Sequence, residues 1–216
     1  MSSPFTPRSN VWARATLLLL LAVAIGAPVM AMAWVRSPYA RGVGADIAQP
    51  MPFDHRIHAA DLQIDCRFCH YTVERSSTAG MPSTRTCVPC HNRPTLDSRL
   101  FAAVNRSLDE GTPIPWRRVT WLPDFVYFDH SIHVNKGVGC ETCHGRVDRM
   151  ARVAQVVPLT MAWCLDCHRT PDRYLRPVEA MTTMGWRPSG DSVVLGARLA
   201  RAYDVHALVN CTACHR

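Results

Sequence analysis

One short pattern occurs five times in this chain of 216 residues, and it uses every cysteine that the chain has. In each copy, two cysteines are separated by two residues, and a histidine directly follows the second cysteine. The copies, numbered one to five in chain order, are Cys66, Cys69 and His70; Cys87, Cys90 and His91; Cys140, Cys143 and His144; Cys164, Cys167 and His168; and Cys211, Cys214 and His215.

Cysteines spaced in this way occur in zinc sites, in redox dithiols and at points of c-type haem attachment. Only haem attachment needs the histidine directly after the second cysteine. Two thioether bonds hold one porphyrin, and the adjacent histidine takes the fifth iron position. We therefore expect five covalent c-type haems, with structural zinc or disulfides as the alternatives. The expected proximal iron ligands are His70, His91, His144, His168 and His215.

A second pattern is duplicated. Phe-Asp-His-x-Ile-His precedes motif one, where it contains His55 and His58, and precedes motif three, where it contains His130 and His133. Histidines three residues apart share a helical face and can still point to different irons. The element resembles one in small cytochromes of the c3 and c7 type. That resemblance implies that His55 and His130 are distal ligands at motifs one and three.

By the same resemblance, His58 and His133 bind two of the other irons. The alternative is that all four are ordinary surface histidines. The remaining histidine, His206, lies five residues before Cys211, so it suits a neighbouring haem better than its own. Methionine is the other common sixth ligand, and Met150 and Met161 are candidates alongside His206.

The polypeptide alone offers little for a core. It has 16 prolines and 8% aromatic residues, and its apolar residues are poorly periodic. We expect a mostly irregular c3/c7-like fold of short α-helices packed around haems. The formal charge of +7 does not indicate nucleic-acid binding. Ten haem propionates bring the total to about +2 with ferric and about −3 with ferrous irons.

The N-terminal region predicts a membrane anchor. Residues 15–35 lack charge and would span about 31 Å as a helix, enough to cross a bilayer. The alternative is a cleaved signal peptide with its cleavage site at Ala31–Ala33. Bacterial haem attachment takes place outside the cytoplasmic membrane. We therefore expect a single-pass protein of that membrane, with a cytoplasmic N-terminus and a periplasmic haem domain.

These features predict seven segments along the chain. They are a cytoplasmic N-terminus (1–14), a transmembrane anchor (15–35), a linker (36–50), a first dihaem unit (51–95), a helix and Pro-rich connector (96–125), a second dihaem unit (126–170), and a C-terminal segment with the fifth haem (171–216). Within them, we expect a helix ending at Gly111 and another capped by Asp191.

The order of features is similar to that of the pentahaem cytochrome c subunit of alternative complex III, a quinol-oxidising bacterial complex. Beyond the anchor and the duplicated element, the likeness rests on Trp116–Val119, Leu122–His130, Gly137–Cys140, Trp163–Arg169 and the final Cys-x-x-Cys-His-Arg. It implies an electron carrier, not an enzyme on its own, that relays electrons from quinol oxidation towards a periplasmic or membrane acceptor. The implied partners are an iron–sulfur subunit, polytopic quinol-binding subunits and a monohaem cytochrome c. One haem held by His and Met is also implied.

Two other families share some of these features. Membrane-anchored quinol dehydrogenases of the tetrahaem type also have one N-terminal helix, but their first motif has Met where this chain has Thr72. Pentahaem nitrite reductases use Cys-x-x-Cys-Lys at the catalytic haem, and this sequence contains no such motif. The tetrahaem-like quinol dehydrogenase is therefore the alternative interpretation.

Overall fold

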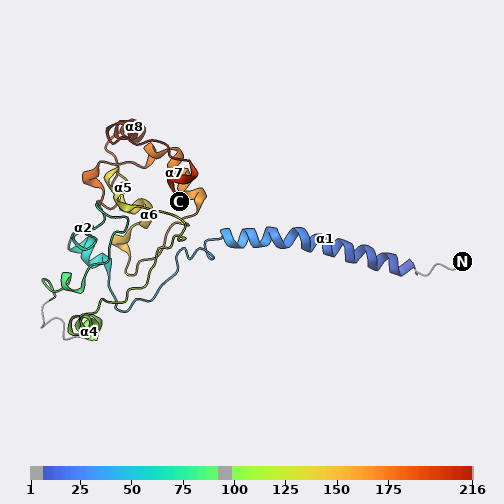
Figure 1. Cartoon of the computed structure of the whole chain (residues 1–216), viewed down its shortest axis with the longest axis horizontal. Coiled ribbons are helices and arrows are strands. Elements are labelled where there is room, and N and C mark those ends of the chain that lie inside the picture. The colour runs from blue at the N-terminus through green and yellow to red at the C-terminus, as the bar shows by residue number, and fades with distance from the viewer. Residues whose placement is uncertain (1–6, 92–98, 216) are drawn as a thin grey trace. The chain divides into compact units, whose positions relative to one another are not determined.

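The computed structural model describes residues 7–91 and 99–215, and the chain divides into two compact units, residues 1–43 and 44–216 (Figure 1). The first unit is dominated by one long helix, α1 (Pro7–Arg36). Its apolar side chains are exposed, and it is long and apolar enough to cross a membrane. A signal sequence at this position would pass the same test, but an exposed apolar helix fits the expected anchor.

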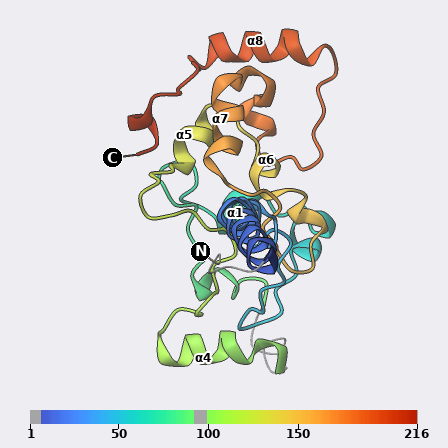
Figure 2. The same ribbon diagram turned by 90° about the vertical axis from the view of Figure 1, so that its right-hand side faces the viewer.

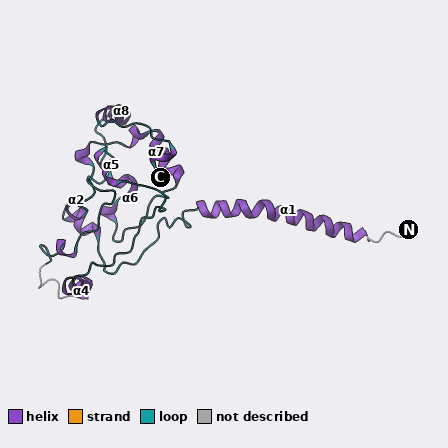
Figure 3. Ribbon diagram, in the orientation of Figure 1, coloured by secondary structure: helices purple, strands orange, loops and turns teal. Residues whose placement is uncertain are grey.

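The second unit is built from short helices joined by loops, and Figure 3 shows no strand among the described residues. Its helices of four or more residues are η1 (Arg56–Asp61), α2 (Cys66–Cys69), α4 (Ala102–Glu110), α5 (His130–Asn135), α6 (Cys140–His144), α7 (Met161–Arg169), η5 (Pro171–Tyr174) and α8 (Ser192–Ala202). Single turns are η2 (Thr84–Thr86), η3 (Arg99–Phe101), η4 (Val147–Arg149), η6 (Val178–Ala180) and η7 (Cys211–Ala213). This is the expected fold class.

Both expected helix ends are found. The helix before Gly111 is η3 followed by α4, and Gly111 ends it with a φ of 65°, a left-handed conformation that favours glycine. The first residues of the expected 96–125 segment lie outside the described residues, which resume at 99. Asp191 caps α8 by accepting hydrogen bonds from the amides of Val193 and Val194.

Most of the buried apolar side chains lie in two small clusters. Seven apolar side chains are buried among the described residues, which is few for a unit of this length. One cluster joins Val73, Val134 and Met181, and the other joins Val104 and Ile114. Protein packing alone therefore leaves the unit weakly supported, as expected if bound cofactors complete the interior.

The two clusters lie in different parts of the unit. Figures 1 and 2 show α4 at one end of the 44–216 unit and α8 at the other, with α2, α5, α6 and α7 between them. The elements that carry the cysteine motifs are thus distributed along the unit.

Candidate haem-binding sites

Each cysteine motif forms a tight helical turn. Motifs one, three and four lie on α2, α6 and α7, and motif five lies on η7. In motifs one, two and five the histidine amide donates to the carbonyl of the first cysteine, at 2.8, 2.9 and 2.9 Å. A turn of this kind places residues i and i+3 on one face. Both sulfurs of a motif can therefore reach the same porphyrin. None of the ten cysteines forms a disulfide bond.

Three distal candidates face proximal histidines at nearly the same distance. The ring centroids are 6.1 Å apart for His58 and His91. They are 6.3 Å apart for His130 and His144, and 6.1 Å apart for His133 and His168. An imidazole nitrogen binds a transition metal at about 2.0–2.1 Å, so the metal lies about 3 Å from the ring centroid. Two rings about 6 Å apart therefore leave room for one iron between them.

The fourth candidate, His55, lies beside the histidine of motif one. Burial, with a contribution from the nearby charge of His70, lowers the pKa of His55 to about 4. Burial also lowers the pKa of His144 to about 4, with a contribution from His130. Both His55 and His144 are therefore neutral at pH 7, and the neutral imidazole is the form that binds a metal.

Six of the nine histidines of these sites have a carbonyl oxygen against Nδ1. A carbonyl only accepts, so Nδ1 carries the proton and Nε2 is left with a free lone pair for a metal. The proximal pairs are His70 with Gly80, His168 with Leu208 and His215 with Phe125, at 2.8, 3.1 and 3.0 Å. The distal pairs are His58 with Asp54, His130 with Ser77 and His133 with Asp129, at 2.9, 2.8 and 2.7 Å. Such partners orient metal-binding histidines.

A phenylalanine orients the histidines of each duplicated element. Phe53 stacks on His58 with centroids 4.3 Å apart and meets His55 edge-on at 4.8 Å. In the second copy, Phe128 contacts its two histidines at 4.5 and 4.7 Å with nearly the same ring angles. The phenylalanine of the sequence pattern is therefore part of the site, because it fixes two imidazoles at once.

His206 has a different setting from the other distal candidates. Its side chain is 73% exposed, and its Nε2 lies 2.8 Å from Asp204 Oδ1. The nitrogen that would bind iron thus faces a carboxylate. Met150 lies beside motif three, where its Cε is near Gly145. Met161 begins α7 and is largely exposed. Among the described residues, none of these three side chains is paired with a proximal histidine in the way that His58, His130 and His133 are.

Sequence reasoning missed one group beside motif three. Arg176 is buried, and its Nη2 lies 2.8 Å from Oε1 of Glu141, a residue inside motif three. Its Nη1 donates to the Thr183 carbonyl, and its guanidinium lies over the Trp186 ring. A Cβ at Gly139 would overlap Arg176. Glu141 inside the motif and Gly139 before it were the features of the sequence that could have indicated this group.

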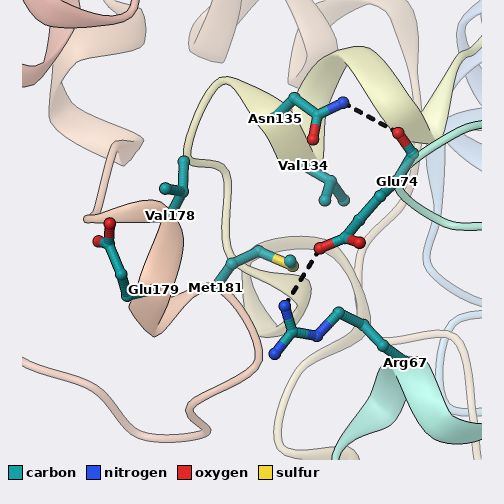
Figure 4. Close-up of a pocket in the computed structure, with 7 residues that line it drawn as sticks. All are labelled: Arg67, Glu74, Val134, Asn135, Val178, Glu179 and Met181. Atoms are coloured by element: carbon teal, nitrogen blue, oxygen red, sulfur yellow. Dashed lines mark hydrogen bonds and ion pairs between the residues drawn. The ribbon is translucent and has the colours of Figure 1, made fainter.

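A cavity of about 280 Å³ marks the meeting of the two duplicated regions (Figure 4). Arg67 and Glu74 line it from the first region and form an ion pair at 3.1 Å. Val134 and Asn135 line it from α5, and the Asn135 amide donates to the Glu74 carbonyl. The rest of its lining, Val178, Glu179 and Met181, comes from the C-terminal segment. Its described lining contains neither cysteine nor histidine, so it is a junction of these three segments and not itself a haem site.

Residues 126–216, which contain motifs three to five, match the family model described as cytochrome c7 and related cytochrome c. This region has the fold class of a c7-like cytochrome domain.

A stretch of 97 residues is 34% identical to the protein named "Menaquinone reductase, multiheme cytochrome c subunit" of Nitratidesulfovibrio vulgaris (strain Hildenborough). The match covers 44% of this chain and 45% of that protein. The chain thus spans less than half the length of this relative.

Proposed function

We propose that the chain binds five c-type haems and relays electrons released by quinol oxidation, as the cytochrome subunit of a membrane complex. The observation that carries the proposal is the set of three histidine ring pairs about 6 Å apart, each joining a cysteine motif to the duplicated element. Bound haem iron would supply one-electron chemistry. The residues of this chain hold and orient that iron.

The proposed ligand assignment follows the ring pairs at three sites: His58 with His91, His130 with His144 and His133 with His168. His55 is assigned to His70 by the resemblance to c3- and c7-type cytochromes and by the effect of the His70 charge on the pKa of His55. An iron held between two imidazoles has no vacant position for a substrate, so these sites support electron transfer and not bond chemistry. The fifth iron is held by His215, with its sixth ligand taken from His206, Met150, Met161 or outside the chain.

The proposed setting is the cytoplasmic membrane, with the N-terminus inside and the haem unit outside. An exposed apolar helix supports an anchor, and the relative named as a subunit of menaquinone reductase supports a quinone-linked complex. By resemblance to alternative complex III, the partners are an iron–sulfur subunit, polytopic quinol-binding subunits and a monohaem cytochrome c. A membrane-anchored quinol dehydrogenase of the tetrahaem type is the second candidate.

The haem count separates these two candidates. Intact mass of the denatured protein should exceed the polypeptide mass by five haems, because all ten cysteines lie in attachment motifs. The variant Cys211→Ser with Cys214→Ser is the matched control and should carry one haem fewer. A wild-type mass gain of four haems, unchanged in the double variant, would show that motif five is not loaded and would favour the tetrahaem-like alternative.

A further inference from the structure

The contacts between motifs place the five sites in a definite spatial order, starting with sites one and two. Their distal candidates, His55 and His58, lie on one short segment, so the two irons must be neighbours. The His58 ring lies 6.1 Å from the ring of His91 in motif two, and Phe53 contacts both His55 and His58.

Sites three and four repeat this arrangement. His130 and His133 lie on α5 and face the histidines of motifs three and four. The second duplicated region therefore also contains a pair of adjacent sites.

The two pairs meet through sites one and three. The side-chain amide of Asn135 on α5 donates to the carbonyl of Glu74, which follows motif one, at 3.0 Å. Nδ1 of His130 donates to the carbonyl of Ser77, which follows motif one in the chain. The buried cluster around Val134 spans the same junction. A distal ligand of site three is thus oriented by the region that forms site one.

Site five joins the row at site four. Nδ1 of His168 donates to the carbonyl of Leu208, three residues before motif five, at 3.1 Å. Burial raises the pKa of the Cys164 thiol, and Cys214 raises it further. The amide of Tyr127 donates to the carbonyl of Cys214 at 2.9 Å, which fastens motif five to the second duplicated region.

We propose that the five haem sites form one unbranched row in the order two, one, three, four, five. The order differs from that along the chain, because the duplicated regions meet through the first site of each. Site two, whose His91 contacts Phe101 just before α4, is one end of the row, and site five is the other. Electrons that cross between the duplicated regions pass between sites one and three. This inference deepens the proposed relay function and rests on it.

The test is to locate the irons in crystals of the wild-type holoprotein by anomalous scattering at the iron edge. Each iron is assigned by the two cysteines bonded to its porphyrin. We expect sites two and five to have one close iron neighbour each, and sites one, three and four to have two. A shortest link between the regions that joins any pair other than one and three would overturn the proposal, as would a site five nearest to site one or two.

A second measurement covers the case in which no crystals form. Loss of site three through Cys140→Ser with Cys143→Ser should leave two separate iron pairs in distance measurements by pulsed electron paramagnetic resonance. Loss of site five through Cys211→Ser with Cys214→Ser should leave a continuous row of four. If both variants leave the same pattern of iron–iron distances, the proposed order of the sites is wrong. Iron positions are independent of partners, so failure of the order and failure of the quinol-linked role are distinguishable.

Discussion

The two duplicated regions have almost the same histidine geometry on different backbones. The first histidine pair lies at η1, a π-helical segment, and the second lies on α5, an ordinary α-helix. The Phe–His contacts nevertheless agree within 0.2 Å, at 4.3 and 4.5 Å for the stacked ring and 4.8 and 4.7 Å for the other. The side-chain pattern, and not the type of helix, thus determines the site.

The regions differ in how their distal histidines are supported. Nδ1 of His130 has the Ser77 carbonyl, which belongs to the other region. Nδ1 of its counterpart, His55, is buried without a partner in the described part of the chain. Duplication reproduced contacts within a region, but a contact that crosses between regions exists in one copy only.

The largest effect is expected from removing a distal histidine. His58→Ala and His133→Ala should each convert one haem from a low-spin to a high-spin or water-bound form, because each removes one of two axial ligands. The two variants should behave alike, since the Phe and Asp contacts are the same in both regions. Absorption and electron paramagnetic resonance spectra of the oxidised proteins measure the change.

His206→Ala is the matched control for these variants. Its exposed ring faces Asp204, and it is a candidate ligand at the fifth iron alone, so any spectral change should be confined to that haem. Fully low-spin spectra for both His58→Ala and His133→Ala would contradict the ligand assignment.

A smaller effect is expected from the ion pairs, which also differ between the regions. The Arg176–Glu141 side chains are 9% and 11% exposed, whereas the Arg67–Glu74 side chains are 44% and 41% exposed. Glu141→Gln leaves a buried charge unpaired and should cost about 3 kcal/mol of unfolding free energy. Glu74→Gln should cost less than about 1 kcal/mol. Denaturant unfolding of the holoprotein, followed by visible absorption, measures both.

The effect of Glu141→Gln should depend on pH. Burial acts to raise the pKa of Glu141, but hydrogen bonds from the Gly185 amide and Arg176 outweigh it and hold the pKa below its ordinary value of 4.5. A lowered carboxyl pKa stabilises the folded state above the unfolded pKa, and that contribution is lost as pH falls through the folded value. The gap between wild type and Glu141→Gln should therefore shrink below about pH 4. A gap that stays constant to pH 3 would contradict this account.

Prediction from the sequence succeeded for two local helix signals. The helix stop at Gly111 and the Asp191 cap were both predicted from neighbouring residues and are both found. The haem ligands inferred from the cysteine motifs and the duplicated histidine element stay predictions. The Ser77–His130 and Arg176–Glu141 contacts join residues 53 and 35 positions apart. No periodicity encodes such pairs, so they could be found only in the folded chain. The contact of His206 with Asp204 is local, and sequence reasoning did not consider it.

The smallest expected effect is a difference in reduction potential between sites two and four. A carbonyl acceptor at Nδ1 makes the imidazole a stronger donor to iron and favours the ferric state. At site four both His133 and His168 have such acceptors, whereas at site two the acceptor is at His58. The haem at site four should therefore have the lower potential. A redox titration followed by haem-resolved nuclear magnetic resonance measures the order.

Sites one and three are the internal control for this comparison. Each has one histidine with a carbonyl acceptor at Nδ1, His70 at site one and His130 at site three, both at 2.8 Å. Their potentials should differ less than those of sites two and four. A lower potential at site two than at site four would contradict the role given to the carbonyl acceptors.

The central claim is that histidines from the duplicated element hold four of the irons. Near-infrared magnetic circular dichroism of the oxidised wild-type holoprotein tests it most directly, because the charge-transfer band of low-spin ferric haem shifts with the axial ligand pair. The account predicts the bis-histidine band for four haems per chain, with the fifth free to differ. High-spin or His/Met signals from two or more haems would contradict it.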